Sequence, residues 1–95
     1  MFYIYALSSI ERNYIYVGMS EHIDDRIKRH QSGREKTTRA YRPFNVIYTE
    51  ALDVERIEAR KREKYWKSGI GKEKLRQIRG DLNSKKTIML KWRNW

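Results

Sequence analysis

Two aromatic stretches decide the fold of this chain: FYIYAL at residues 2–7 and YIYVG at residues 14–18. Both are rich in aromatic and β-branched residues, which is typical of strands. The polar segment at residues 8–13 lies between them and has the character of a turn, so the sequence predicts a β-hairpin. Side chains alternate between the faces of a strand, so each strand presents a pair of tyrosines on one face. These pairs are Tyr3 with Tyr5 and Tyr14 with Tyr16.

A helix is expected directly after the second stretch. Ser20 is a candidate N-cap for a helix that begins near Glu21, and Gly33 predicts its end. Ile23, Ile27 and His30 recur at helical spacing along this segment, with Arg26 on the same side.

Further elements follow in the rest of the chain. A basic loop at residues 34–42 leads through Pro43 to a third predicted strand at residues 44–52. Apolar spacing then predicts helices over about residues 53–67 and 72–79.

The tail at residues 81–95 has two interpretations. It contains the apolar side chains Ile88, Met89, Leu90, Trp92 and Trp95. These side chains either pack on the preceding domain or bind a partner, and the sequence leaves both interpretations open.

The charge of the chain indicates a polyanionic partner. Lys and Arg number 22 and Asp and Glu number 12 among the 95 residues, which gives a net charge of +10. Nucleic acid is the first candidate and an anionic membrane surface the second. The sequence has no apolar run that would span a bilayer and no secretion signal, so we expect a soluble, cytoplasmic protein. The absence of cysteine excludes disulfides and thiolate metal sites.

Glu63 is an acid in an unexpected place. It lies between Ala59 and Trp66 on a helix face that otherwise consists of inward-facing residues. A buried carboxylate needs a partner, which a metal ion or a positive charge can supply. From the helix alone, an ion pair with Arg60, Lys67 or another nearby basic residue is the favoured interpretation, because structural ion pairs are common.

Taken in order, these residues resemble the GIY-YIG endonuclease family, in particular its small stand-alone members. The first triplet of the family corresponds to residues 3–5 and the second to residues 16–18. Arg26 and His30 match the arginine and histidine of the family's first helix, and Glu63 matches its metal-binding glutamate. Each triplet alone is a weak signal, whereas the ordered set is a strong one.

The resemblance covers about residues 2–79 and includes three departures. Tyr3 stands where the family name has glycine, and Val17 replaces isoleucine. Met19 stands where some repair members carry lysine. The phenols of Tyr5 and Tyr16 are retained.

The resemblance implies an α+β fold in which helices flank a small three-stranded antiparallel sheet. It places this nuclease domain at residues 1–80. It also implies hydrolysis of phosphodiester bonds in DNA, with RNA as an open alternative, and a link to DNA repair or recombination.

The resemblance also implies a role for each site residue. Glu63 would hold Mg²⁺ or Mn²⁺ and Arg26 a phosphate oxygen. Tyr16 would act as the general base and Tyr5 would position the water or the phosphate. His30 would orient Tyr5 or a phosphate, or share in proton transfer.

Basic side chains on the protein surface would contact the phosphate backbone of the nucleic acid. The candidates are Arg34, Lys36, Arg39, Arg42, Lys61, Lys64 and Lys67. We expect about half of them to touch the ligand, because such contacts use one face of a protein. Two alternatives remain: a binding module of the same fold with little or no turnover, and an interaction protein that docks through Trp92 and Trp95.

Overall fold

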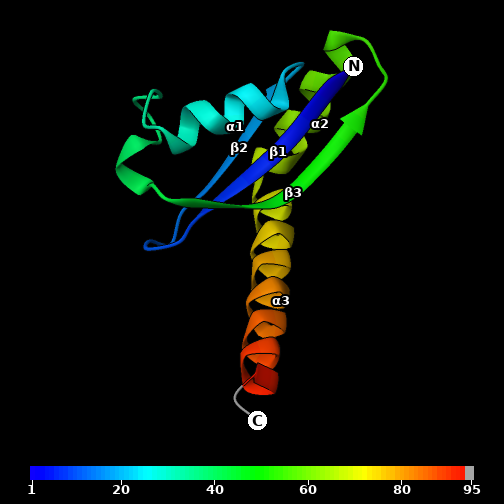
Figure 1. Ribbon diagram of the computed structural model, residues 1–95. Coiled ribbons are helices and arrows are strands. Elements are labelled where there is room, and N and C mark those ends of the chain that lie inside the picture. The colour runs from blue at the N-terminus through cyan, green and yellow to red at the C-terminus, as the bar shows by residue number, and fades with distance from the viewer. Residues whose placement is uncertain (94–95) are drawn as a thin grey trace.

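The computed structural model describes the backbone of residues 1–93 and the side chains of residues 1–83. It confirms the α+β fold, with a three-stranded antiparallel sheet and helices packed on it (Figure 1). The elements in chain order are β1 (Phe2–Ser9), β2 (Ile15–Ser20), α1 (Ile23–Gln31), the short 3-10 helix η1 (Arg39–Tyr41), β3 (Phe44–Leu52), α2 (Arg56–Lys67) and α3 (Gly69–Arg93).

The predicted hairpin forms one side of the sheet. The strand order is β2-β1-β3, and both neighbours run antiparallel to the central β1. Tyr5 lies opposite Gly18, and Leu7 lies opposite Tyr16. β1 is buried along most of its length because side chains from helices cover both of its faces.

The two faces of the sheet have different cores. One face packs Ile4, Ala6, Ile15, Val17 and Ile47 against Trp66 of α2 and Leu75 of α3. The other packs Tyr5, Leu7 and Phe44 with Tyr14, Tyr16 and Tyr41 and with Ile23 and Ile27 of α1. Figure 1 shows the same layers, with α1 on one side of the sheet and α2 and α3 on the other. Strand alternation therefore places Tyr5 and Tyr16 on the α1 face.

The start of α1 differs from the prediction. His22, not Ser20, occupies the N-cap position, and no side chain caps the helix. The hydroxyl of Ser20 instead accepts a hydrogen bond of 2.9 Å from the backbone N–H of His22. This local bond satisfies a donor just before the helix, so the first turn begins later than the cap signal predicts. The predicted stop is confirmed, because Gly33 has φ of 80° two residues after the helix ends.

The last helix also differs from the prediction. α3 runs without a break from Gly69 to Arg93, whereas the sequence predicts a short helix over residues 72–79. Gly80 therefore does not end it; an isolated glycine costs a helix only about 1 kcal/mol, which its neighbours can offset. The later turns of α3 extend beyond the sheet (Figure 1). The apolar side chains of the tail lie outside the described residues, so its packing and its role stay predictions.

No helix in the described part of the chain is both long enough and apolar enough to cross a lipid bilayer.

Candidate active site

The hydroxyl of Tyr5 belongs to a buried hydrogen-bond chain on the α1 face. Its oxygen lies 3.0 Å from Nε2 of His30, and Nδ1 of His30 lies 2.8 Å from Oγ1 of Thr38. All three residues are at most 2% exposed. His30 therefore makes the contact with Tyr5 that its predicted orienting role requires.

Burial sets the protonation of this chain. It raises the pKa of Tyr5 well above the ordinary 10.0; the neighbouring Tyr16 adds to the rise and the charge of Arg26 opposes it. Burial also lowers the pKa of His30 from its ordinary 6.5. Near neutral pH, Tyr5 is thus an uncharged phenol and His30 a neutral imidazole.

Tyr16 lies beside the same two rings. Its ring centroid is 6.2 Å from that of Tyr5 and 4.7 Å from that of His30. Gly18 lies opposite Tyr5, and a Cβ at this position would stand 2.4 Å from the Tyr5 hydroxyl oxygen. The glycine that closes the second triplet therefore leaves the space that the phenol of Tyr5 occupies.

Arg26 brings a positive charge to the site from α1. Its side chain is 47% exposed, and its Nη1 lies 3.3 Å from Oε1 of Glu35. The same oxygen accepts a bond of 2.8 Å from Nε of Arg29, and this bond is the main cause that lowers the pKa of Glu35. Exposed pairs contribute little stability, so Arg26 can exchange Glu35 for a phosphate at low cost.

Glu63 lies on α2 and is 8% exposed. Its Oε1 accepts a hydrogen bond of 3.1 Å from Nη1 of Arg60, and its Oε2 accepts one of 3.1 Å from Nζ of Lys67. These are the ion pairs that the sequence offers as the common alternative to a metal. The negative charge of Glu63 also raises the pKa of Tyr5, so it acts on the phenol across the sheet.

The surroundings of Glu63 are compatible with a single-carboxylate metal site. No cluster of three or more acidic or histidine side chains that could hold an ion occurs among the described residues. Mg²⁺ does not require one, since it keeps several waters and binds through one or two carboxylates plus substrate phosphates. The two basic side chains that pair with Glu63 are well exposed: that of Arg60 is 60% exposed and that of Lys67 is 49% exposed. Both can therefore turn away from Glu63 into solvent.

Arg62 fixes the helix that carries Glu63. Its guanidinium donates to both carboxylate oxygens of Glu50 on β3, over 2.6 and 2.9 Å. This bidentate bond lowers the pKa of Glu50. It also links α2 to β3 and restricts the orientation of the helix on the sheet.

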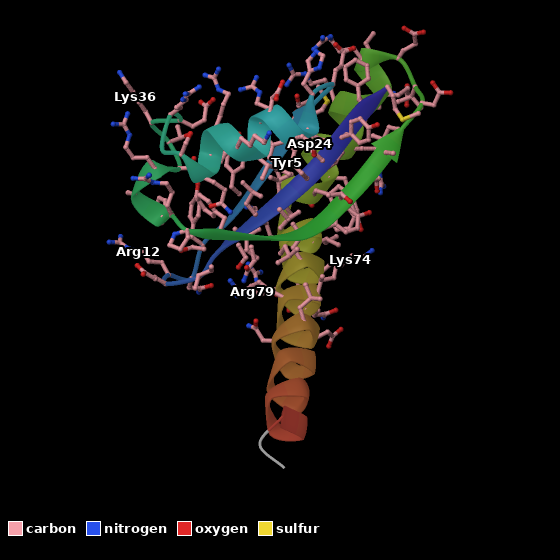
Figure 2. All side chains as sticks on the ribbon, in the orientation of Figure 1. Tyr5, Arg12, Asp24, Lys36, Lys74 and Arg79 are labelled. Atoms are coloured by element: carbon pink, nitrogen blue, oxygen red, sulfur yellow. The ribbon has the colours of Figure 1, made fainter. Side chains whose placement is uncertain are left out.

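The candidate backbone contacts fall into two groups. All seven side chains are exposed: Arg34, Lys36, Arg39 and Arg42 lie between α1 and β3, and Lys61, Lys64 and Lys67 lie on α2. Figure 2 shows Lys36 at the edge of the molecule, pointing away from the sheet, and Tyr5 on the central strand. The two groups flank opposite faces of the sheet. The structure therefore does not gather them into one patch.

Comparison with known proteins identifies the family. The sequence profile of the GIY-YIG catalytic domain matches residues 1–76. The chain belongs to the GIY-YIG family. The solution NMR structure of the UPF0213 protein BH0048 from Bacillus halodurans is 34% identical, over 84% of this chain and 87% of that one, with a TM-score of 0.50. No curated protein sequence matches the chain. Membership of this nuclease family implies a nucleic-acid substrate.

Two residues of this GIY-YIG site are absent from the sequence-based prediction. Thr38 binds His30, and Glu35 binds Arg26. Both lie in the segment between α1 and β3, which the sequence presents as a basic loop. Spacing does not specify side-chain direction in such a segment, so no signal in the sequence identifies them.

Proposed function

We propose that this GIY-YIG protein is a metal-dependent endonuclease that hydrolyses phosphodiester bonds in DNA. One observation carries the proposal: the buried hydroxyl of Tyr5 is hydrogen-bonded to His30, and the ring of Tyr16 lies beside the rings of both residues. A hydrophobic core has no need of this combination, whereas phosphate chemistry does.

The residue types suit distinct steps of hydrolysis. Tyr16, as a phenolate, would take a proton from the attacking water, and Tyr5, whose hydroxyl is bonded to His30, would position the water or the phosphate through its hydroxyl oxygen. Arg26 would leave Glu35 and hold a phosphate oxygen, where it offsets developing charge. A divalent ion, Mg²⁺ or Mn²⁺, held by Glu63 would supply Lewis-acid stabilisation of the leaving oxygen.

A second candidate is a nucleic-acid-binding module with little turnover. The observation that favours it is that Arg26 and Glu63 are both engaged in internal ion pairs. In an active enzyme, substrate and metal must displace these partners; in a binding module, they remain.

A cleavage assay separates the candidates. End-labelled duplex, nicked, branched and single-stranded DNA, and a matching RNA, are incubated with the protein in Mg²⁺ or Mn²⁺. We expect the wild type to cleave at least one substrate and Glu63→Gln to lose this cleavage while it keeps its fold. Glu73→Gln is the matched control, because Glu73 is an exposed glutamate paired with Arg76 on α3.

The outcomes are distinct. Cleavage that survives Glu63→Gln contradicts the metal assignment, and binding without any cleavage supports the module. A preference for branched or nicked DNA supports a link to repair or recombination.

A further inference from the structure

A pocket lies where the end of β2 meets α1 and α2, outside the chain of Tyr5, His30 and Thr38. Its volume is about 250 Å³, and Arg26, Arg56 and Arg60 all line it. Arg26 comes from one side of the sheet and the other two arginines from the opposite side. The pocket thus joins the two sides of the sheet, and Arg26 of the candidate site is part of its lining.

The lining of this pocket is strongly positive. Three arginines line it, and Glu21 is the one carboxylate among its lining residues in the described part of the chain. Glu35 and Glu63, which pair with Arg26 and Arg60, are not among them.

Arg56 has no carboxylate partner among the described residues. Its guanidinium lies over the ring of Phe2, 5.2 Å from the centroid, and this contact holds the side chain at the pocket. Arg56 and Arg60 are four residues apart on α2, so they lie side by side on one face of the helix. Two neighbouring guanidinium forks that face solvent are suited to bidentate bonds with phosphate oxygens.

We propose that Arg56 and Arg60 form a second phosphate site, which holds the backbone phosphate next to the one that Arg26 holds. This inference rests on the proposed function, because the ligand is a nucleic-acid strand whose scissile phosphate lies at Arg26. Neither Arg56 nor Arg60 belongs to the backbone contacts that the sequence predicts. A phosphate that binds Arg60 also leaves Oε1 of Glu63 without its present donor.

Salt-dependent binding tests the site without catalysis. Fluorescein-labelled single-stranded and duplex DNA are titrated with the protein in EDTA, and anisotropy gives Kd at several salt concentrations. A variant that binds one phosphate fewer should show a slope of log K against log[salt] that is shallower by about 0.7–0.9. We expect Arg56→Gln to show this change with an affinity loss of about tenfold, and Arg56→Lys to keep the slope with a smaller loss.

Arg76→Gln is the matched control, because it removes an equal charge from an exposed arginine on α3. If Arg56→Gln and Arg60→Gln bind as Arg76→Gln does while the wild type binds with a steep slope, the pocket site is wrong and the proposed function stands. If the wild type does not bind DNA even at low salt, both are wrong. Circular dichroism confirms that each variant is folded.

DNA strands with single uncharged phosphate analogues show which phosphate Arg56 contacts. In a series of DNA strands, each carries one methylphosphonate at a different position. The wild type should lose affinity at a position next to the cleaved bond, and Arg56→Gln should be insensitive there. If the methylphosphonate at that position lowers the affinity of Arg56→Gln as much as that of the wild type, the proposal is overturned, because Arg56 would then bind a different phosphate. Inorganic phosphate should compete only weakly; strong competition would indicate a free-phosphate site instead and overturn the strand assignment.

Discussion

The hydroxyl of Tyr5 and the ring of His30 are both uncharged near neutral pH, and this restricts how they bond. A neutral imidazole has one N–H and one acceptor nitrogen. If Tyr5 donates to Nε2, the proton of His30 lies on Nδ1 and is donated to Oγ1 of Thr38. We therefore expect Thr38 to set the tautomer of His30 and, through it, the direction of the Tyr5 hydroxyl.

Thr38→Val tests this dependence. It keeps the shape of the side chain but leaves the Nδ1–H without its acceptor. We expect His30 to change to the Nε2–H tautomer, with a loss of about 1–3 kcal/mol in the free energy of unfolding. ¹⁵N NMR of the imidazole reports the tautomer, and Thr38→Ser should restore it. A wild type that already has the proton on Nε2 would contradict the account.

The buried His30 should also make stability depend on pH. Because burial lowers its pKa in the folded state, the unfolded chain binds more protons below the ordinary pKa of about 6.5. The free energy of unfolding should therefore fall as the pH drops below about 6.5. Urea unfolding at several pH values measures the fall, which His30→Gln should reduce. An NMR titration of the wild type is an independent check, and a His30 pKa at or above the ordinary value would contradict the expectation.

Sequence patterns predict most of this residue-level arrangement. Strand alternation places Tyr5 and Tyr16 on one face, and helical spacing places Arg26 and His30 on one side of α1. Tertiary packing then joins the two pairs, as the family resemblance implies. Thr38 is not predictable in this way, because an irregular segment has no period that fixes the direction of its side chains.

At the level of elements, α2 and α3 meet in a contact that only glycine permits. A Cβ at Gly71 would lie 2.2 Å from the carbonyl oxygen of Tyr65 and 2.6 Å from Cα of Trp66. These are backbone atoms, so they cannot rotate out of the way. The contact is close to the last turn of the helix that carries Glu63, and it helps to fix how the two helices cover the sheet.

Gly71→Ala should therefore destabilise the protein by about 1–3 kcal/mol, through overpacking at this contact. Gly80→Ala is the matched control within the same helix, because a Cβ there meets no described atom within 4 Å. It should instead stabilise the protein by about 0.5–1 kcal/mol. Urea unfolding gives both values, and effects of the same sign would show that the helix contact is looser than the structure indicates.

The ends of the helices are where sequence patterns are least informative. Ser20 has the residue type of a cap, yet it does not cap α1, and the glycine that follows the helix predicted over residues 72–79 does not end α3. Both signals are worth about 1 kcal/mol, which a local hydrogen bond or continued helical pairing can outweigh. The third strand at residues 44–52 is predicted to the residue, because strong β-formers follow the rigid Pro43.

In the molecule as a whole, the sheet separates the catalytic candidates into two sets. Tyr5, Tyr16, Arg26 and His30 belong to the α1 face, and Glu63 belongs to α2 on the other face. These residues are far apart along the chain, so spacing alone does not predict that they form one site. Only the family resemblance predicts it. The pocket lined by Arg26 and Arg60 is where the two sets approach each other.

Single-turnover cleavage of DNA by tyrosine variants tests the central claim most directly. Tyr5→Phe and Tyr16→Phe each remove one hydroxyl from the site, and Tyr14→Phe removes one from a ring stacked on Tyr41. We predict that Tyr16→Phe lowers the rate by about 10²–10⁴-fold, that Tyr5→Phe also lowers it, and that Tyr14→Phe leaves it nearly unchanged. Equal rates for all three variants and the wild type would contradict a phosphodiesterase site built on Tyr5 and Tyr16.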